Sequence, residues 1–152
     1  MVAARQLNLL RAKGRCIAVL IAAAAATPLA IASTLTPATQ GMGTHTALGL
    51  PPCGWAAASG MPCPSCGMTT SFTWAAHGDL WASFVTQPMG FVLALASAMT
   101  VLVCLWAACT GARVQGPAEA ILLRPVVGWS ALVFFLVAWG WKIWAVQAGI
   151  TP

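Results

Sequence analysis

Residues 88–110 read PMGFVLALASAMTVLVCLWAACT, a run that holds no charged side chain. About 20 mostly apolar residues are enough to cross a bilayer as a helix. Residues 16–35 and 126–148 are of similar length and apolar character, and Lys142 is the only charged residue in any of these stretches. The pattern predicts an all-α integral membrane protein with three transmembrane helices, over residues 16–35, 88–110 and 126–148.

The composition of the whole chain supports the same class. Of the 152 residues, 60% are hydrophobic and only 6% are charged, and the mean hydropathy is +0.86. A soluble domain carries about a quarter charged residues. We therefore expect a single membrane domain over residues 1–152, with the lipid bilayer as its partner.

Lysine and arginine are unevenly distributed between the segments that flank the spans. Residues 36–87 hold none, whereas six lie before the first span or between the second and third: Arg5, Arg11, Lys13, Arg15, Arg113 and Arg124. Basic residues close to membrane ends stay on the cytoplasmic side. We therefore predict a multi-pass protein of the inner (plasma) membrane, with a cytoplasmic tail (1–15), an exported loop (36–87), a cytoplasmic loop (111–125) and an exported tail (149–152).

This topology explains most of the basic charge. Six of the seven basic residues are accounted for, so the net charge of +5 does not indicate a nucleic-acid partner, and none is expected. Lys142 lies in the last third of its span and is expected to extend outward to the interface. The first span, with its basic start and its small residues Ala30 and Ala32, also fits a cleavable signal peptide, which would equally leave residues 36–87 outside.

Two short interfacial helices are expected in the exported loop. Residues 36–62 are rich in Pro, Gly, Thr and Ser and are predicted to form loop. The spacing of Phe72, Ala75 and Ala76 predicts an amphipathic helix from about Pro64 to His77, with Thr69 and Thr70 on its surface.

Gly78 is expected to end this helix. Asp79 is placed to cap a second helix, Leu80 to Gln87, because its carboxylate can accept from backbone amides of the first turn.

The second and third spans each carry a pattern with a physical reason. Gly90, Ala94 and Ala98 form a small-residue stripe that suits close helix packing, which predicts a membrane-protein partner at this face. Near the ends of the third span lie aromatic residues expected to form an interfacial belt: Trp129, Trp139, Trp141 and Trp144.

The cysteines of the exported loop are the main candidates for a chemical function. Cys63 and Cys66 are separated by two residues, and Cys53 lies ten residues upstream. The cysteines of the spans are expected to be small apolar packing residues: Cys16, Cys104 and Cys109.

Three chemistries remain open at this point. A disulfide from Cys53 to Cys63 or Cys66 would staple a loop that has no core of its own. Cys63 and Cys66 would be the catalytic pair of a thiol-disulfide redox protein, with Cys63 the more acidic thiol if it caps the helix that Pro64 opens. Zinc or copper would be held by Cys53, Cys63 and Cys66 with His77 as a further ligand, although the sequence requires no cofactor.

At these residues the chain resembles a small bacterial membrane family, the domain of unknown function 2752. The resemblance rests on an upstream Cys53, then Cys-Pro-x-Cys-Gly-x-Thr over residues 63–69, and then Gly78 and Asp79. The family commonly has Arg where this chain has Thr70, and Asn-Pro where it has Gln87-Pro88. The resemblance implies three spans and a retained first helix, and it implies no activity.

The sequence leads us to expect a structural or interaction component whose exported loop is held by a disulfide or a metal. The alternatives are a redox membrane protein and a metal-binding accessory protein. Whether the chain is an enzyme is undecided, since no carboxylate pair, nucleophile triad or nucleotide fingerprint is present in the sequence.

Overall fold

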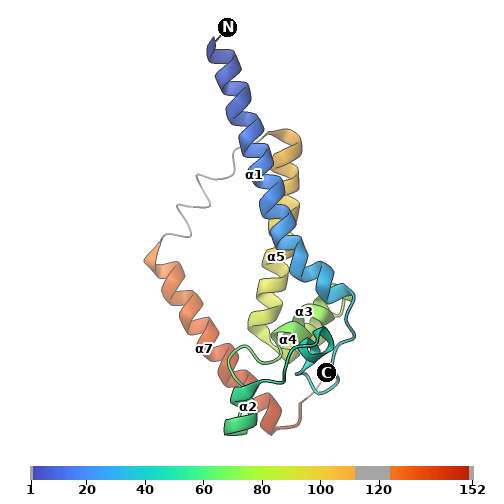
Figure 1. Ribbon diagram of the computed structural model, residues 1–152. Coiled ribbons are helices and arrows are strands. Elements are labelled where there is room, and N and C mark those ends of the chain that lie inside the picture. Colours follow the sequence, from blue (N-terminus) through green and yellow to red (C-terminus); the bar gives the residue numbers. More distant parts are fainter. Residues whose placement is uncertain (1, 112–123, 151–152) are drawn as a thin grey trace.

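The computed structural model describes residues 2–111 and 124–150, with side chains described from residue 12 onward. In these ranges every regular element is a helix, as expected (Figure 1). In chain order they are α1 (Val2–Ser33), the 3-10 helix η1 (Thr44–Leu48), α2 (Gly54–Ser59), α3 (Met68–Ala76), α4 (Leu80–Thr86), α5 (Pro88–Thr110) and α7 (Pro125–Gln147). The predicted cytoplasmic loop, with Arg113, falls almost entirely outside the described residues.

Three of these helices are long and apolar enough to cross a membrane: Ala12–Ser33 within α1, and α5 and α7 over their full lengths. This confirms the three predicted spans. Both α5 and α7 begin with proline at the first helical position, where the missing N–H costs no hydrogen bond. Gly111, with φ of 73°, then ends α5.

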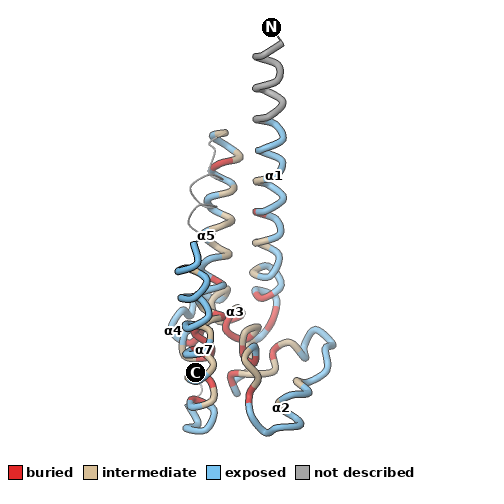
Figure 2. The backbone as a smooth tube through the Cα atoms, turned by 90° about the vertical axis from the view of Figure 1, so that its left-hand side faces the viewer, coloured by how far each residue is buried: buried red, intermediate tan, exposed pale blue. Residues whose placement is uncertain are grey.

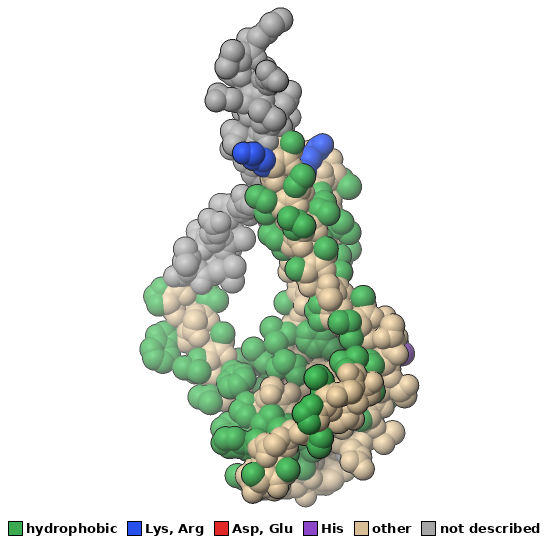
Figure 3. All heavy atoms as spheres, viewed as in Figure 1, with side chains coloured by type: hydrophobic (Ala, Val, Ile, Leu, Met, Phe, Trp, Pro, Cys, Tyr) green, Lys and Arg blue, Asp and Glu red, His purple; other side chains and the backbone are tan. Residues whose placement is uncertain are grey.

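The helices α1 and α5 run antiparallel and pack along each other (Figure 1). Ala22 and Ala32 of α1 and Ala94 and Ala107 of α5 are buried, so small side chains let the two backbones approach closely. At one end, Arg15 donates to the carbonyl of Cys109 at 3.2 Å. The space-filling view shows Lys and Arg side chains near this end of the helix pair, and below them apolar side chains mixed with other side chains and backbone (Figure 3).

The small-residue stripe of α5 is used within the chain itself. A methyl group added to Gly90 would lie 2.8 Å from the Cβ of Ser71, so this glycine is what allows α3 to rest against α5. Ala94 is 2% exposed. Gly90 and Ala94 are therefore covered by the chain's own helices, whereas Ala98, the third residue of the stripe, is only half-buried.

The spans bury little of their own surface. In each span only 11% of the most apolar window is buried inside the chain. Figure 2 shows the buried residues gathered instead where α3, α4 and the first turns of α5 meet. This distribution is the one expected when lipid, and not a protein core, surrounds the apolar side chains.

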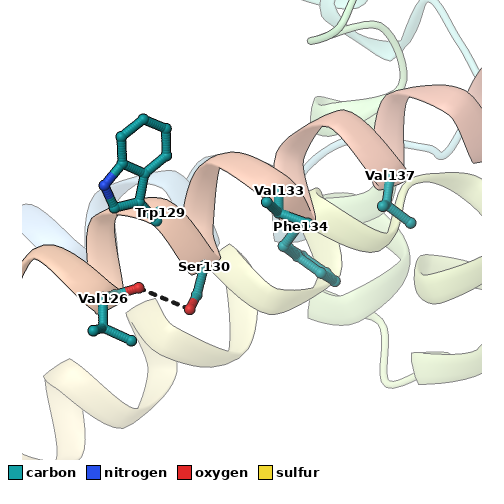
Figure 4. A pocket seen from close by; sticks show the side chains of 6 residues that line it. All are labelled: Val126, Trp129, Ser130, Val133, Phe134 and Val137. Atoms are coloured by element: carbon teal, nitrogen blue, oxygen red, sulfur yellow. Dashed lines mark hydrogen bonds between the residues drawn. The ribbon is translucent and has the colours of Figure 1, made fainter.

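The third span is attached mainly through its C-terminal part. Its N-terminal half lies apart from α5 (Figure 1). There an open apolar groove of about 570 Å³ runs along one side of α7 (Figure 4), and it is lined by Val126, Trp129, Ser130, Val133, Phe134 and Val137. The groove holds no cysteine and is separate from the site described below.

Residues 36–87, called here the cysteine segment, contain more helix than expected. The predicted loop of residues 36–62 includes η1 and α2, each framed by glycines in the left-handed conformation or by Cys53. The first predicted interfacial helix is shorter than expected, since α3 begins at Met68 and not at Pro64. The second matches its prediction: α4 begins after Asp79, whose Oδ1 accepts from the Ala82 amide at 2.8 Å.

The buried side chains of the cysteine segment are mostly hydroxyls. Thr70, Ser71, Thr73 and Ser83 are fully buried, so the expectation that Thr70 lies on the helix surface was wrong, whereas Thr69 is half-buried. Ser71 Oγ donates to carbonyls of Ser83 and Gln87, and Ser83 Oγ returns a bond to the Ser71 carbonyl. Small hydroxyl side chains are favoured here because they pack closely and satisfy backbone groups at the same time.

Candidate functional site

The cysteine motif forms a turn that precedes α3. The amide of Cys66 donates to the Cys63 carbonyl at 3.0 Å, and the Met68 amide donates to the Ser65 carbonyl at 3.1 Å. Gly67 is the N-cap of α3, with φ of 86°. Cys63 therefore does not cap a helix opened by Pro64, and the predicted dipole effect on its thiol has no geometric basis.

The three cysteines of the segment meet at one point. The Sγ atoms of Cys53, Cys63 and Cys66 all lie within 4.8 Å of one another, and those of Cys63 and Cys66 are 2.9 Å apart. Cys53 is the N-cap residue of α2, so two separate turns supply the cluster. All three are free thiols in this structure, and the expected disulfide from Cys53 is not formed.

The members of the close pair differ in acidity. Burial disfavours the thiolate of Cys63, but hydrogen bonding with Cys66, Ser65 and Cys53 outweighs it and lowers the pKa of Cys63 from 9.0 to about 7. Burial, followed by the hydrogen bond with Cys63, raises the pKa of Cys66 to about 12. Cys63 is thus the acidic thiol, as predicted, although hydrogen bonding is the cause and the helix dipole is not.

Neither histidine joins the three sulfurs. His77 is the C-cap of α3, at the end opposite the motif, and its Nδ1 bonds the Thr73 carbonyl at 2.8 Å. His45 Nε2 bonds the Pro51 carbonyl at 3.2 Å. Among the described residues, the group that brings metal-ligating atoms together consists of Cys53, Cys63 and Cys66 alone.

Lys142 is buried against the cysteine segment, a position that the sequence did not indicate. Its side chain is 3% exposed, and Nζ donates to the carbonyls of Gly41 at 2.9 Å and Thr86 at 3.0 Å. The expectation that this side chain extends outward to the interface was wrong, because residues 36–87 fold over the end of α7. A single charge within an apolar span was the signal that could have suggested a partner.

Two tryptophans of α7 also bind the cysteine segment. Trp139 Nε1 donates to the Pro62 carbonyl at 3.1 Å, next to Cys63, and Trp141 Nε1 donates to the Val85 carbonyl at 3.0 Å. These two residues anchor the segment, whereas Trp129 and Trp144 are 69% and 52% exposed and fit the expected aromatic belt better. One turn of α7 thus supplies three side-chain donors to backbone carbonyls around the cysteines.

Gly67, within the cysteine motif, is so closely surrounded that there is no room for a side chain. A methyl group at this position would lie 2.7 Å from the Gly41 carbonyl oxygen and 2.8 Å from Lys142 Nζ. Gln87 holds the motif from the other side, since its Nε2 donates to the Pro64 carbonyl at 2.9 Å. The turn is therefore held by groups from the start of the segment, from its end and from α7.

Comparison with known proteins identifies only the region of the motif. Residues 53–101 match the family described as "Protein of unknown function (DUF2752)", in agreement with the resemblance carried by the cysteine motif. The matched residues run from Cys53 through α3 and α4 into α5, and so include all three clustered cysteines. No curated protein and no solved structure matches the chain.

Proposed function

We propose, from the premise that residues 53–101 belong to this family of unknown function, that the protein is a small multi-pass membrane protein whose cysteine segment binds one thiophilic metal ion. Cys53, Cys63 and Cys66 are its ligands. The bound ion joins the turn before α2 to the turn before α3. Its role is structural: it fixes the shape of a surface at the membrane, as expected of an interaction component.

The convergence of three sulfurs within 4.8 Å is the observation that carries this proposal. A tetrahedral zinc site with Zn–S bonds of about 2.3 Å places its sulfurs about 3.8 Å apart. The distance of 2.9 Å between Cys63 and Cys66 and the upper limit of 4.8 Å bracket this value. Small side-chain rotations suffice to surround one ion.

The donor set indicates the class of metal. Three sulfurs suit Zn²⁺ or Cu⁺, which prefer soft ligands, and do not suit Mg²⁺ or Ca²⁺, which take oxygen. A three-thiolate site leaves a fourth position open to water or to a partner's ligand.

Metal content of the purified protein tests the proposal. We expect about one zinc or copper ion per chain in the wild type, and a loss of that metal in Cys53→Ser and Cys66→Ser. Cys104→Ser is the matched control, since Cys104 lies in α5 outside the cluster and should leave the metal content unchanged. Wild-type protein prepared without chelator, with three reduced thiols and no metal, would contradict the proposal.

Dithiol exchange is the second candidate, and the unequal acidity of Cys63 and Cys66 favours it. In this reaction the Cys63 thiolate attacks a disulfide of a partner protein, forms a mixed disulfide and releases a partner thiolate. Cys66 then loses its proton and attacks Cys63 Sγ, which releases the second partner thiolate and leaves a Cys63–Cys66 disulfide. The partner gains the two electrons that the pair loses.

Peptide mapping under non-reducing conditions separates the candidates. A Cys63–Cys66 bond with Cys53 free supports dithiol exchange, and a bond from Cys53 to either partner supports the disulfide staple. Three thiols that a chelator makes reactive support the metal site.

We also infer that the cysteine segment lies outside the cytoplasm of the cell. Support comes from the absence of Lys and Arg in residues 36–87 and from the position of Arg15 at the opposite end of the α1–α5 pair. A membrane-impermeant thiol reagent, applied to intact cells after mild reduction and chelation, should label Cys63. Labelling only after lysis would reverse the orientation.

A further inference from the structure

Lys142 is a buried charge inside a transmembrane helix, and such a charge needs compensation. Its side chain is 3% exposed, and two carbonyl oxygens accept from its ammonium group. Carbonyl dipoles lower the cost of burying the charge but do not neutralise it. In membrane spans, buried ionisable residues generally pair with an opposite charge or mark a functional site.

The opposite charge available to Lys142 is a thiolate of the cluster. Its ammonium group lies against Gly67, the residue that follows Cys66 in the chain, so a Cys66 thiolate formed on metal binding would lie close to this charge. The one described carboxylate at this end of the molecule, that of Asp79, is already bound to the Ala82 amide as the cap of α4.

The other described cations lie far from the cluster. Arg124 precedes α7 and is separated from Lys142 by about 27 Å of helix at 1.5 Å per residue. Lys13 and Arg15 lie near the opposite end of the α1–α5 pair, where Arg15 reaches the Cys109 carbonyl. Within the part of the chain that the structure describes, Lys142 is therefore the cation available to the three sulfurs.

The charge balance of the site indicates the charge of the ion that it would bind. Three thiolates together with one ammonium group leave two negative charges, which a divalent cation cancels and a monovalent cation does not. A neutral assembly is the least costly to hold in a partly buried site at a membrane surface. A protein group that sits behind the ligands of a metal can tune its binding in this way.

We propose that Lys142 is the positioning residue and counter-charge of the cysteine cluster, and that it enables Cys53, Cys63 and Cys66 to bind a divalent thiophilic cation such as Zn²⁺ as three thiolates. This inference rests on the proposed metal-binding function. It assigns to the third span a direct electrostatic role at the site, beyond holding the segment in place.

Titration of the full-length, reduced protein in detergent with Cd²⁺ tests the inference. Cadmium is a divalent substitute for zinc, and its thiolate charge-transfer absorbance reports the number of bonded thiolates. Lys142→Met should weaken Cd²⁺ binding about 10- to 100-fold, the range found when residues behind the ligands are removed. It should also lower the absorbance per bound ion, because one thiol keeps its proton.

Further variants separate charge from folding. Lys142→Gln keeps an N–H donor for the carbonyls but lacks the charge, so it should show the same loss, whereas Lys142→Arg should retain most of the affinity and absorbance. Arg124→Met removes a charge from the same helix at a distance and should behave as the wild type. Wild-type affinity and absorbance in both Lys142→Gln and Lys142→Met would overturn the inference, as would an equal loss in Arg124→Met. A wild-type protein that binds no Cd²⁺ would overturn the proposed function itself.

Discussion

The transmembrane helices and the cysteine segment differ in which kinds of side chain they expose and which they bury. The spans carry large apolar side chains on the outside, such as Leu102 at 61% exposed and Val137 at 63% exposed. The segment buries hydroxyls, with Thr70, Ser71 and Ser83 fully enclosed. Apolar side chains gain little by leaving lipid for a protein interior, so the specific contacts of this protein come from hydrogen bonds and close backbone approach.

Gly67→Ala should have the largest effect, because it breaks the closest approach in the segment. The added methyl group would meet the Gly41 carbonyl and Lys142 Nζ below 3 Å, and φ of 86° is strained for any residue with a side chain. We expect a loss of about 2 to 5 kcal/mol in the free energy of unfolding. Thermal unfolding in detergent, followed by circular dichroism, measures it.

Gly78→Ala is the control for this prediction. Gly78 has nearly the same φ, 87°, but nothing lies within 4 Å of the added methyl group. Its cost should be confined to backbone strain, about 1 to 2 kcal/mol. Equal losses at both glycines would show that the packing at Gly67 does not matter.

Ser71→Ala should have the next largest effect, since it removes hydrogen bonds from the hydroxyl interior. Ser71 Oγ contacts the Ser83 carbonyl, the Ser83 hydroxyl and the Gln87 carbonyl. The expected loss is about 1 to 2 kcal/mol, because the buried hydrogen bonds of this hydroxyl are lost while the Ser83 and Gln87 carbonyls keep their backbone donors. Ser130→Ala in α7, whose hydroxyl is exposed and bonds only its own helix, should change stability by less than about 0.5 kcal/mol.

Trp139→Phe tests the contact between the third span and the cysteine segment. The ring is largely retained, but the bond from Nε1 to the Pro62 carbonyl is lost, which should cost about 1 kcal/mol. Trp144→Phe, at a half-exposed position, should cost less. Proteolysis of the segment in native protein should accelerate in the first variant and not in the second.

The smallest change concerns reactivity alone. With its pKa lowered from 9.0 to about 7, metal-free Cys63 is about half thiolate at pH 7. Its alkylation rate should therefore rise as pH increases through about 7 and level off above that, while Cys66, with a pKa of about 12, still gains reactivity at pH 10. An alkylation midpoint for Cys63 near 9 would contradict the hydrogen-bonded arrangement of the pair.

Features that depend on nearby residues were predictable. The spans were predicted to within a few residues, because the length and apolarity needed to cross a bilayer are properties of a continuous stretch. The cap at Asp79 was correct since its partner, the Ala82 amide, lies three residues away. The start of α3 was not, because the turn at Cys63–Cys66 is stabilised by contacts from Gln87 and α7.

Composition and local order were therefore enough to establish an all-helical membrane protein with a cysteine motif between its first two spans. Only the tertiary structure brings the three sulfurs close together, buries Thr70 and Thr73, and places Lys142 against the cysteine motif. Lys142 bonds residues 101 and 56 positions away, through backbone carbonyls that every residue possesses. A carbonyl acceptor has no side-chain identity, so no pattern along the chain marks it as the partner of a distant lysine.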